Sequence, residues 1–364
     1  MQGDIQAVFD EGYALQSRQG ILPPMPTLVV GRDQALRRLR DQLGIGGRVR
    51  GSLYIQVLTA VHGWPGVGKT TMAAVLAHDP EVSASFPDGV LWTSLGQKPD
   101  LLSELAKWGL ALGSEDLMRA KSIKDARDRL TALLRDRRML LIVDDVWETE
   151  HAITFKVGGR RCAMLVTTRH LIVAEALAPT ADNIYKLDIL SDEDALELLA
   201  KLAPTVVEQH RRECHEVVQE VEGLPLALQV VGRLLNVEAS RGWGIKDLLR
   251  ELRSDVARLL RTAAPPELSD LLSQTTPTVA ALLGKSTERL NTQTRARFAL
   301  LGAFAPKPAS FGAEAMAGVW DVELSEAKRT IDELIDRGLL ESLGSKRFWM
   351  HALLVAHAKS LLRD

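Results

Sequence analysis

Short apolar runs alternate with segments of helical periodicity between residues 54 and 187. Residues 124–135 show that helical period clearly. Strands that alternate with helices predict a parallel sheet covered by helices on both faces, an α/β fold. The expected strands are residues 54–62, 90–95, 139–143, 163–167 and 184–187.

The pattern before the first strand is different. Residues 1–22 are predicted to form a short, mostly helical leader, and Pro23, Pro24 and Pro26 an extended connector, because proline disfavours helix at itself and at the preceding residue. Leucines at positions 36, 39 and 43 recur at helical spacing among arginines, which predicts a short amphipathic helix.

Helical periodicity replaces the strands after Leu190 and continues to about residue 260. Ser191 followed by three acids is typical of a helix start, and Gly223 and Pro225 can end one helix and open the next. Pro265, Pro266 and Pro277 indicate a second boundary. The remaining residues are predicted to be mainly helical, with a short hairpin near residues 344–345.

Composition limits the classes of protein that fit. The chain has 364 residues, 46% of them hydrophobic, and 45 basic against 47 acidic side chains, so nucleic-acid binding lacks a basic footprint. Two cysteines, Cys162 and Cys214, do not make a disulfide framework and favour a reducing compartment. No apolar run approaches the roughly 18 residues of a membrane span, and the first residues do not resemble a signal peptide, which predicts a cytoplasmic protein.

Residues 63–70 carry the main chemical motif, with the sequence GWPGVGKT. It fits the phosphate-binding pattern G-x-x-x-x-G-K-[ST], between an apolar strand and a predicted helix. Its glycines let backbone N–H groups approach phosphates, its lysine reaches the β- and γ-phosphates, and its threonine binds Mg²⁺. The alternative, an accidental glycine-rich turn, does not account for this context. The predicted contacts are Gly63, Gly66, Val67, Gly68, Lys69, Thr70 and Thr71.

Two further strands deliver polar residues to the same edge of the sheet, because ligands lie at the carboxyl ends of parallel strands. Asp144 is predicted to hold Mg²⁺ with Thr70. Asp145 either orients or deprotonates the attacking water or merely caps a turn before Trp147, and the residues favour neither. Arg169 ends the run LVTTR and is predicted to sense the γ-phosphate, the alternative being a surface arginine paired with a helix acid.

Together these residues resemble the NB-ARC ATPases, a class of signal-transduction proteins that includes apoptotic protease-activating factors, plant immune receptors and bacterial regulators. The ordered motifs cover nearly the whole chain: LVVGR at residues 28–32, the phosphate-binding loop, LLIVDD at 140–145, TTR at 167–169, GLPLAL at 223–228 and WMHAL at 349–353. The resemblance implies that Val29, Val30 and Arg32 approach the adenine, that Pro225 packs on it, and that Leu224 belongs to the same binding site. The alternative for residues 223–228 is a plain helix–turn–helix junction.

The resemblance also implies an architecture and a switch. The leader and linker would be residues 1–25, the P-loop nucleotide-binding domain 26–189, an all-α helical domain 190–270 and a winged-helix domain 271–364. ADP would hold a closed state and ATP an open, self-assembling homo-oligomer, with slow hydrolysis. His351 would donate a hydrogen bond to the β-phosphate of ADP, although Ala352 replaces the aspartate that usually follows it. The alternative is a core histidine in an apolar helix.

Two other functions compete with the switch. A winged-helix DNA-binding regulator controlled by ATP would need a basic face, but residues 285–364 hold 12 basic and 10 acidic side chains, a net of +2. A metabolic P-loop kinase would need an acceptor pocket, and the sequence shows none. We expect the chain to be the core of a longer protein whose effector and sensor domains lie outside it.

Overall fold

The computed structural model describes residues 22–45, 54–60, 66–240, 245–250, 283–284, 286–306, 309–344 and 346–362. Its first part contains a five-stranded sheet in the order β2-β3-β4-β1-β5. Every neighbouring pair is parallel, which confirms the predicted α/β sheet. The strands are β1 (Tyr54–Ala60), β2 (Val90–Gly96), β3 (Leu140–Val146), β4 (Ala163–Thr168) and β5 (Ile184–Leu187).

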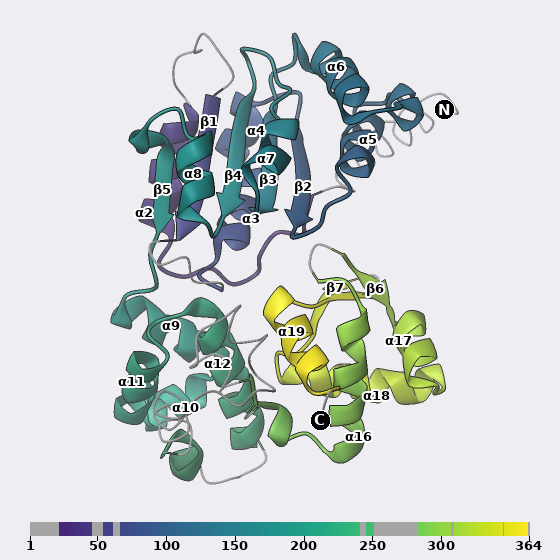
Figure 1. Cartoon of the computed structure of the whole chain (residues 1–364). Helices are drawn as coiled ribbons and strands as arrows, with labels where there is room; N and C mark the ends of the chain where they lie inside the picture. Colours follow the sequence, from purple (N-terminus) through teal and green to yellow (C-terminus); the bar gives the residue numbers. More distant parts are fainter. Residues whose placement is uncertain are drawn as a thin grey trace, which may run out of the picture. The chain divides into compact units, whose positions relative to one another are not determined.

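Helices cover both faces of this sheet (Figure 1). One face carries α5 (Leu101–Ala111), α6 (Ile123–Leu134), α7 (Thr149–Thr154) and α8 (Leu171–Leu177). The other carries α2 (Asp33–Leu43), α3 (Lys69–Ala77) and α4 (Pro80–Ser85). Two 3-10 turns complete this part, η1 (Asp116–Arg119) and η2 (Ala181–Asn183).

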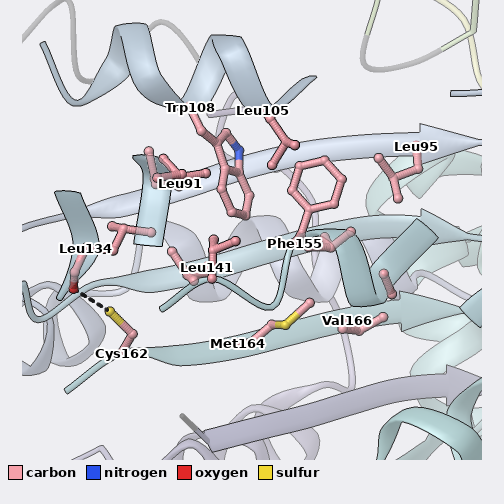
Figure 2. Close-up of a cluster of buried hydrophobic side chains, with 14 of the residues drawn as sticks. Leu91, Leu95, Leu105, Trp108, Leu134, Leu141, Phe155, Cys162, Met164 and Val166 are labelled. Carbon is pink, nitrogen blue, oxygen red and sulfur yellow. Dashed lines mark hydrogen bonds between the residues drawn. The ribbon is translucent and has the colours of Figure 1, made fainter. Parts of the chain in front are cut away.

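The period-two alternation of β3 and β4 builds the core under α5 to α8. Leu141 and Met164 point from neighbouring strands toward the aromatic rings of Trp108 and Phe155, whose centroids are 5.0 Å apart in an edge-to-face contact (Figure 2). The indole of Trp108 donates to the carbonyl of Trp92 at 3.0 Å, which satisfies the polar atom of this buried ring. Fully burying a Leu, Met or Phe side chain contributes roughly 1.5–3 kcal/mol, so this core stabilises the packing of α5 to α8 on the sheet.

The amphipathic helix predicted from the leucine spacing is α2, in which Leu36, Leu39 and Leu43 are buried. The predicted helix start at Ser191 is also confirmed, because its hydroxyl accepts from the backbone N–H of Asp194 and caps α9. Pro225 opens α12, as expected for a residue that lacks an N–H. The helices after β5 are α9 (Asp192–Leu202), α10 (Pro204–Gln209), α11 (Arg211–Glu220) and α12 (Pro225–Ser240).

The C-terminal part combines helices with a three-stranded antiparallel sheet in the order β6-β8-β7. The predicted hairpin is formed by β7 and β8, while β6 was not predicted because it is only two residues long. Arg233 of α12 donates to the carbonyl of Ile335 at 2.9 Å and so ties α12 to this part. Its elements are α16 (Thr292–Leu300), η4 (Leu301–Ala303), β6 (Phe311–Gly312), α17 (Ala313–Trp320), α18 (Leu324–Asp336), β7 (Glu341–Gly344), β8 (Arg347–Trp349) and α19 (Ala352–Ser360).

The chain divides into two compact units between Asp188 and Ile189. The segments Val29–Gly31 and Gly66 to Gly68 group with the second unit, and Arg32 and Lys69 with the first. Among the described residues, no helix combines the length and apolarity that crossing a bilayer requires. The predicted leader and the prolines at 265, 266 and 277 lie outside the described residues.

Candidate functional site

The phosphate-binding motif leads into the first turn of a helix. Lys69 begins α3, with Thr70 and Thr71 following in its first turn. Gly66 and Gly68 precede it with φ angles of +81° and +102°, values that favour glycine. Backbone N–H groups at such a helix start form an anion-binding site. Gly63 lies outside the described residues.

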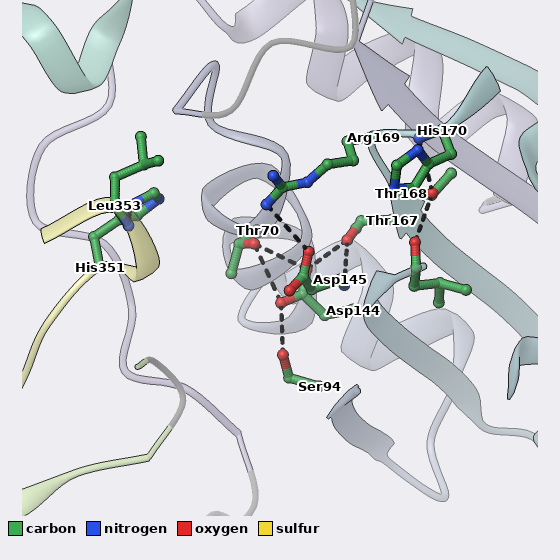
Figure 3. A network of polar contacts seen from close by, with 11 residues as sticks. Thr70, Ser94, Asp144, Asp145, Thr167, Thr168, Arg169, His170, His351 and Leu353 are labelled. Atoms are coloured by element: carbon green, nitrogen blue, oxygen red, sulfur yellow. Dashed lines mark hydrogen bonds and ion pairs between the residues drawn. The ribbon is translucent and has the colours of Figure 1, made fainter. Parts of the chain in front are cut away.

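Asp144 lies at the carboxyl end of β3 and collects hydroxyl groups from three other elements (Figure 3). Thr70 of α3 donates to its Oδ1 at 2.9 Å, Thr167 of β4 donates to the same oxygen at 2.5 Å, and Ser94 of β2 donates to Oδ2 at 3.2 Å. Register explains the convergence, because Ser94 pairs directly with Asp144 across β2 and β3. The structure therefore brings together the two residues that the sequence predicts as metal ligands.

Burial and the neighbouring Asp145 raise the pKa of Asp144 to about 6, while the three hydroxyl donors oppose that shift. The side chain is almost inaccessible, at 3% exposure. A raised pKa means that burying the ionised carboxylate costs free energy, and a bound cation would offset that cost.

The pKa of Lys69 is shifted in the opposite direction. It is lowered to about 8, mainly by burial and also by repulsion from Arg169, although Asp145 and Asp144 favour the charged form. Two cations are thus close enough to repel each other at this edge of the sheet, which two phosphate groups would counter.

Asp145 adopts a left-handed backbone conformation, with φ of +52°, and its N–H donates to the hydroxyl of Thr167 at 2.9 Å. Aspartate adopts this conformation more readily than most residues, and Glu222, Asp321 and Lys346 adopt it too, so the catalytic and the turn-capping role of Asp145 both stay open. Its carboxylate lies 3.8 Å from Nη2 of Arg169. Arg169 is therefore mostly buried, and its acidic partner lies on strand β3 rather than on a helix.

The oxygen-rich set at Thr70 and Asp144 fits a magnesium ion, which prefers one or two carboxylates and completes its shell with water and phosphate oxygens. Among the described residues, no group of three or more His, Cys, Asp or Glu side chains could hold a metal by itself. A divalent cation here would accordingly be held jointly by this pair and by a bound phosphate.

The structure describes each of the residues predicted to contact the adenine. The guanidinium of Arg32 is buried and donates to the carbonyl of Asp188 at 2.8 Å. Val29 and Val30 group with the second unit. Leu224 and Pro225 follow Gly223, whose φ of +60° and close approach to the carbonyl of Leu190 leave no room for a side chain.

His351 caps the N-terminus of α19 rather than lying inside an apolar helix. Its Nδ1 accepts from the backbone N–H of Leu353 at 3.2 Å, so the proton of the neutral ring is on Nε2. The side chain of Ala352 lies outside the described part of the chain.

Two residues of the Asp144 network did not appear among the predicted site residues. Thr167 belongs to the TTR motif, and strand alternation could have placed it beside Asp144. Ser94 gives no motif signal, because its contact follows from the order of β2 and β3 in the sheet. Trp147 was considered only as a neighbour of Asp145, yet its ring contacts Arg169.

Several known proteins resemble this chain in sequence. Residues 45–208 match the family model described as the NB-ARC domain. "Regulatory protein AfsR" of Streptomyces coelicolor is 28% identical over 98% of this chain and 34% of its own length. "Apoptotic protease-activating factor 1" of Homo sapiens is 24% identical over 93% of this chain and 26% of its own.

A plant protein and a solved structure complete the comparison. "Probable disease resistance protein At5g04720" of Arabidopsis thaliana is 28% identical over 88% of this chain and 36% of its own. The chain therefore spans between a quarter and about a third of these relatives. The solved structure of the Aeropyrum pernix ORC2 protein aligns over 95% of this chain and 96% of its own, with a TM-score of 0.44 and 14% identity.

Proposed function

The chain carries an NB-ARC domain, and from this premise we propose that it is an adenine-nucleotide-dependent switch. The observation that carries the proposal is the meeting of Thr70, Thr167 and Ser94 on the buried carboxylate of Asp144, next to Lys69. A buried acid and a buried lysine at the carboxyl edge of a parallel sheet suit a triphosphate and its metal.

Each of these residues has a distinct task in the proposal. The backbone after Gly66 and Gly68 holds phosphate oxygens, and Lys69 neutralises charge on the β- and γ-phosphates. Thr70 and Asp144 would hold Mg²⁺, which would supply positive charge to stabilise the phosphates. Asp145, whose carboxylate also faces Arg169, orients a water molecule for hydrolysis, and this hydrolysis is slow.

His351 provides the link between nucleotide and the C-terminal region in this proposal. The Nε2–H tautomer set by its cap is the form that can donate to a phosphate oxygen. One hydrogen bond to a charged group contributes roughly 1.5–3 kcal/mol, while moving a two-state equilibrium from 1:99 to 99:1 needs about 5.5 kcal/mol. Further contacts, including those of Leu224 and Pro225, must therefore contribute to the closed state.

The finer parts of the proposal follow from the family. Residues 26–189 act as nucleotide-binding domain, 190–270 as helical domain and 271–364 as winged-helix domain. The antiparallel sheet β6-β8-β7 among helices supports the last assignment. The ADP state is closed and the ATP state self-assembles, in the cytoplasm, together with the effector and sensor regions of a longer protein.

The test compares Asp144→Asn with Asp128→Asn, which removes an exposed acid of α6 and serves as matched control. Nucleotide affinity is measured by calorimetry with Mg²⁺ and with EDTA. The proposal predicts that Asp144→Asn loses the gain that Mg²⁺ gives, while the control retains it. An equal response to Mg²⁺ in both variants would exclude Asp144 as metal ligand.

A further inference from the structure

Arg169 has an unusual set of partners for a half-buried arginine. Its guanidinium carbon lies 4.4 Å from the centroid of the Trp147 ring, and only 17% of its side chain is exposed. The nearest acid, Asp145, is 3.8 Å from Nη2, beyond hydrogen-bond distance. Among the described residues, this cation therefore has two partners, the aromatic face of Trp147 and the carboxylate of Asp145, and neither occupies its N–H donors with a short hydrogen bond.

Trp147 is itself held by ring contacts. Its centroid is 5.1 Å from that of His170, and both Trp147 Nε1 and His170 Nε2 are buried without a hydrogen-bond partner in the described part of the chain. The backbone N–H of His170 donates to Thr168 Oγ1 at 3.1 Å, and that hydroxyl donates to the carbonyl of Val146 at 2.7 Å. The ends of β3 and β4 therefore hold the stack in a fixed frame.

A stacked guanidinium keeps its hydrogen-bonding capacity. The attraction between a cation and a ring uses the flat face of the guanidinium, while its five N–H donors lie in the plane. An acceptor such as a carboxylate would instead occupy those donors. Stacking on Trp147 orders the side chain before an anion arrives and leaves its donors available to that anion.

We propose that Trp147 is a positioning residue that holds Arg169 ready for the terminal phosphate and thereby sets the preference of the site for ATP over ADP. This inference rests on the proposed nucleotide-binding function of the same site. Because only ATP has the γ-phosphate, the stack affects the affinity for ATP and leaves that for ADP nearly unchanged. Trp147 itself contacts neither nucleotide and acts through Arg169 alone.

The experiment measures the dissociation constants of Mg²⁺-ADP and of a non-hydrolysable Mg²⁺-ATP analogue for Trp147→Leu, Trp147→Phe and Arg169→Gln. Trp147→Leu should lower the ratio of ATP to ADP affinity about three- to thirtyfold, the range of a partly desolvated cation–π contact. Trp147→Phe keeps an aromatic face and should restore most of the ratio. In the Arg169→Gln background, Trp147→Leu should change the ratio no further.

Several results would overturn the inference. Equal losses for ATP and ADP in folded Trp147→Leu would make the ring a packing residue only, as would an undiminished effect of Trp147→Leu without Arg169. If Trp147→Leu does not fold, Trp147→Phe decides. A ratio of ATP to ADP affinity that Trp147→Phe lowers equally with and without Arg169 would contradict the proposal, as would a ratio that Arg169→Gln leaves unchanged. Failure of the proposed function is distinct, because it would appear as wild-type protein that binds neither nucleotide.

Discussion

The charged form of Asp144 is disfavoured by some of its neighbours and stabilised by others. Asp144 is nearly inaccessible, and its pKa is raised by burial and by Asp145, yet three hydroxyl groups donate to it. The hydroxyl of Thr167 has the widest role, since it donates to Asp144 and accepts from the N–H of Asp145. This threonine thus connects the predicted metal ligand to the strained residue that follows it.

Replacing Thr167 by valine keeps the shape of the side chain and removes both hydrogen bonds. Leaving a buried carboxylate and an N–H without these partners should lower the free energy of unfolding by about 1–3 kcal/mol, measured by urea denaturation. Thr167→Ser retains the hydroxyl and should lose less. A stability of Thr167→Val equal to that of wild type would show that the hydroxyl does not stabilise this position.

The sequence predicted the residue types at the site but not all of their contacts. Lys69, Thr70, Asp144, Asp145 and Arg169 were identified from motifs, and the structure brings them to one edge of the sheet. Whether Asp145 has more than a turn-capping role stays a prediction, because aspartate also adopts a positive φ in ordinary turns. Ser94 could not be found without the order of the strands, because its contact spans 50 residues of sequence.

At the scale of elements, the turn between α11 and α12 packs closely against the segment that precedes α9. Gly223 lies between α11 and α12 with φ of +60°, and a Cβ there would lie 2.5 Å from the carbonyl oxygen of Leu190. The same segment is tied back, since the N–H of Leu190 donates to the carbonyl of Gly223 at 3.1 Å. Backbone conformation and space therefore both demand glycine at this position.

Gly223→Ala should accordingly be far more damaging than a change at a glycine with free space. Gly113 is the matched control, because its φ is +80° and, among the described residues beyond its chain neighbours, no heavy atom lies within 4 Å of where a Cβ would stand. We expect a loss of about 1 kcal/mol for Gly113→Ala and roughly 3 kcal/mol or more for Gly223→Ala, measured by thermal or urea unfolding. Similar losses would mean that the Leu190 segment can move away at little cost.

Helix α19 contains a buried histidine, His357, that should make the stability of the fold depend on pH. Burial lowers the pKa of His357 to about 4, and its Nε2 lies 3.0 Å from the hydroxyl of Thr287. The unfolded chain takes up this proton near pH 6.5 and the folded chain does not, so stability should fall as the pH drops from about 6.5 to about 4.

Between pH 7 and pH 5 the contribution of His357 should amount to about 2 kcal/mol of unfolding free energy. The measurement is urea denaturation at both pH values for wild type and His357→Gln. The variant can keep a hydrogen bond to Thr287 but has no proton to take up, so its pH dependence should be flatter by that amount. An unchanged slope would show that His357 has the same pKa in the folded and the unfolded chain.

Patterns of hydrophobic residues predicted most of these elements. The parallel strands, the leucine-rich helix α2 and the capped start of α9 follow from periodicity and capping, which are local properties. Strand β6 was missed because two residues, Phe311 and Gly312, show no period. Its existence depends on pairing with Arg347 and Phe348 of β8, which are distant in the sequence.

For the whole molecule, the proposed switch depends on coupling between the bound nucleotide and the C-terminal region. His351 is the residue to which this coupling is assigned, with a tautomer that suits donation to phosphate. His351→Ala should speed the release of ADP about ten- to a hundredfold, as expected for one hydrogen bond to a charged group, without abolishing binding. Release is followed with a fluorescent ADP analogue.

The control for that measurement is His215→Ala, which changes a histidine of α11 that faces Asp192. Its ADP release should equal that of wild type. Retention of ADP that is the same in His351→Ala, His215→Ala and wild type would contradict the assignment of His351 as the coupling residue.

In the proposed function, Lys69 and strand β3, which carries Asp144 and Asp145 near its carboxyl end, bind the phosphates of an adenine nucleotide. The most direct test is calorimetric titration of wild type and Lys69→Met with Mg²⁺-ATP and Mg²⁺-ADP, after circular dichroism has shown that both proteins are folded. We expect at least a roughly tenfold loss of affinity in the variant, because a buried charge opposite phosphate is removed. Equal affinity in the two proteins would contradict the claim.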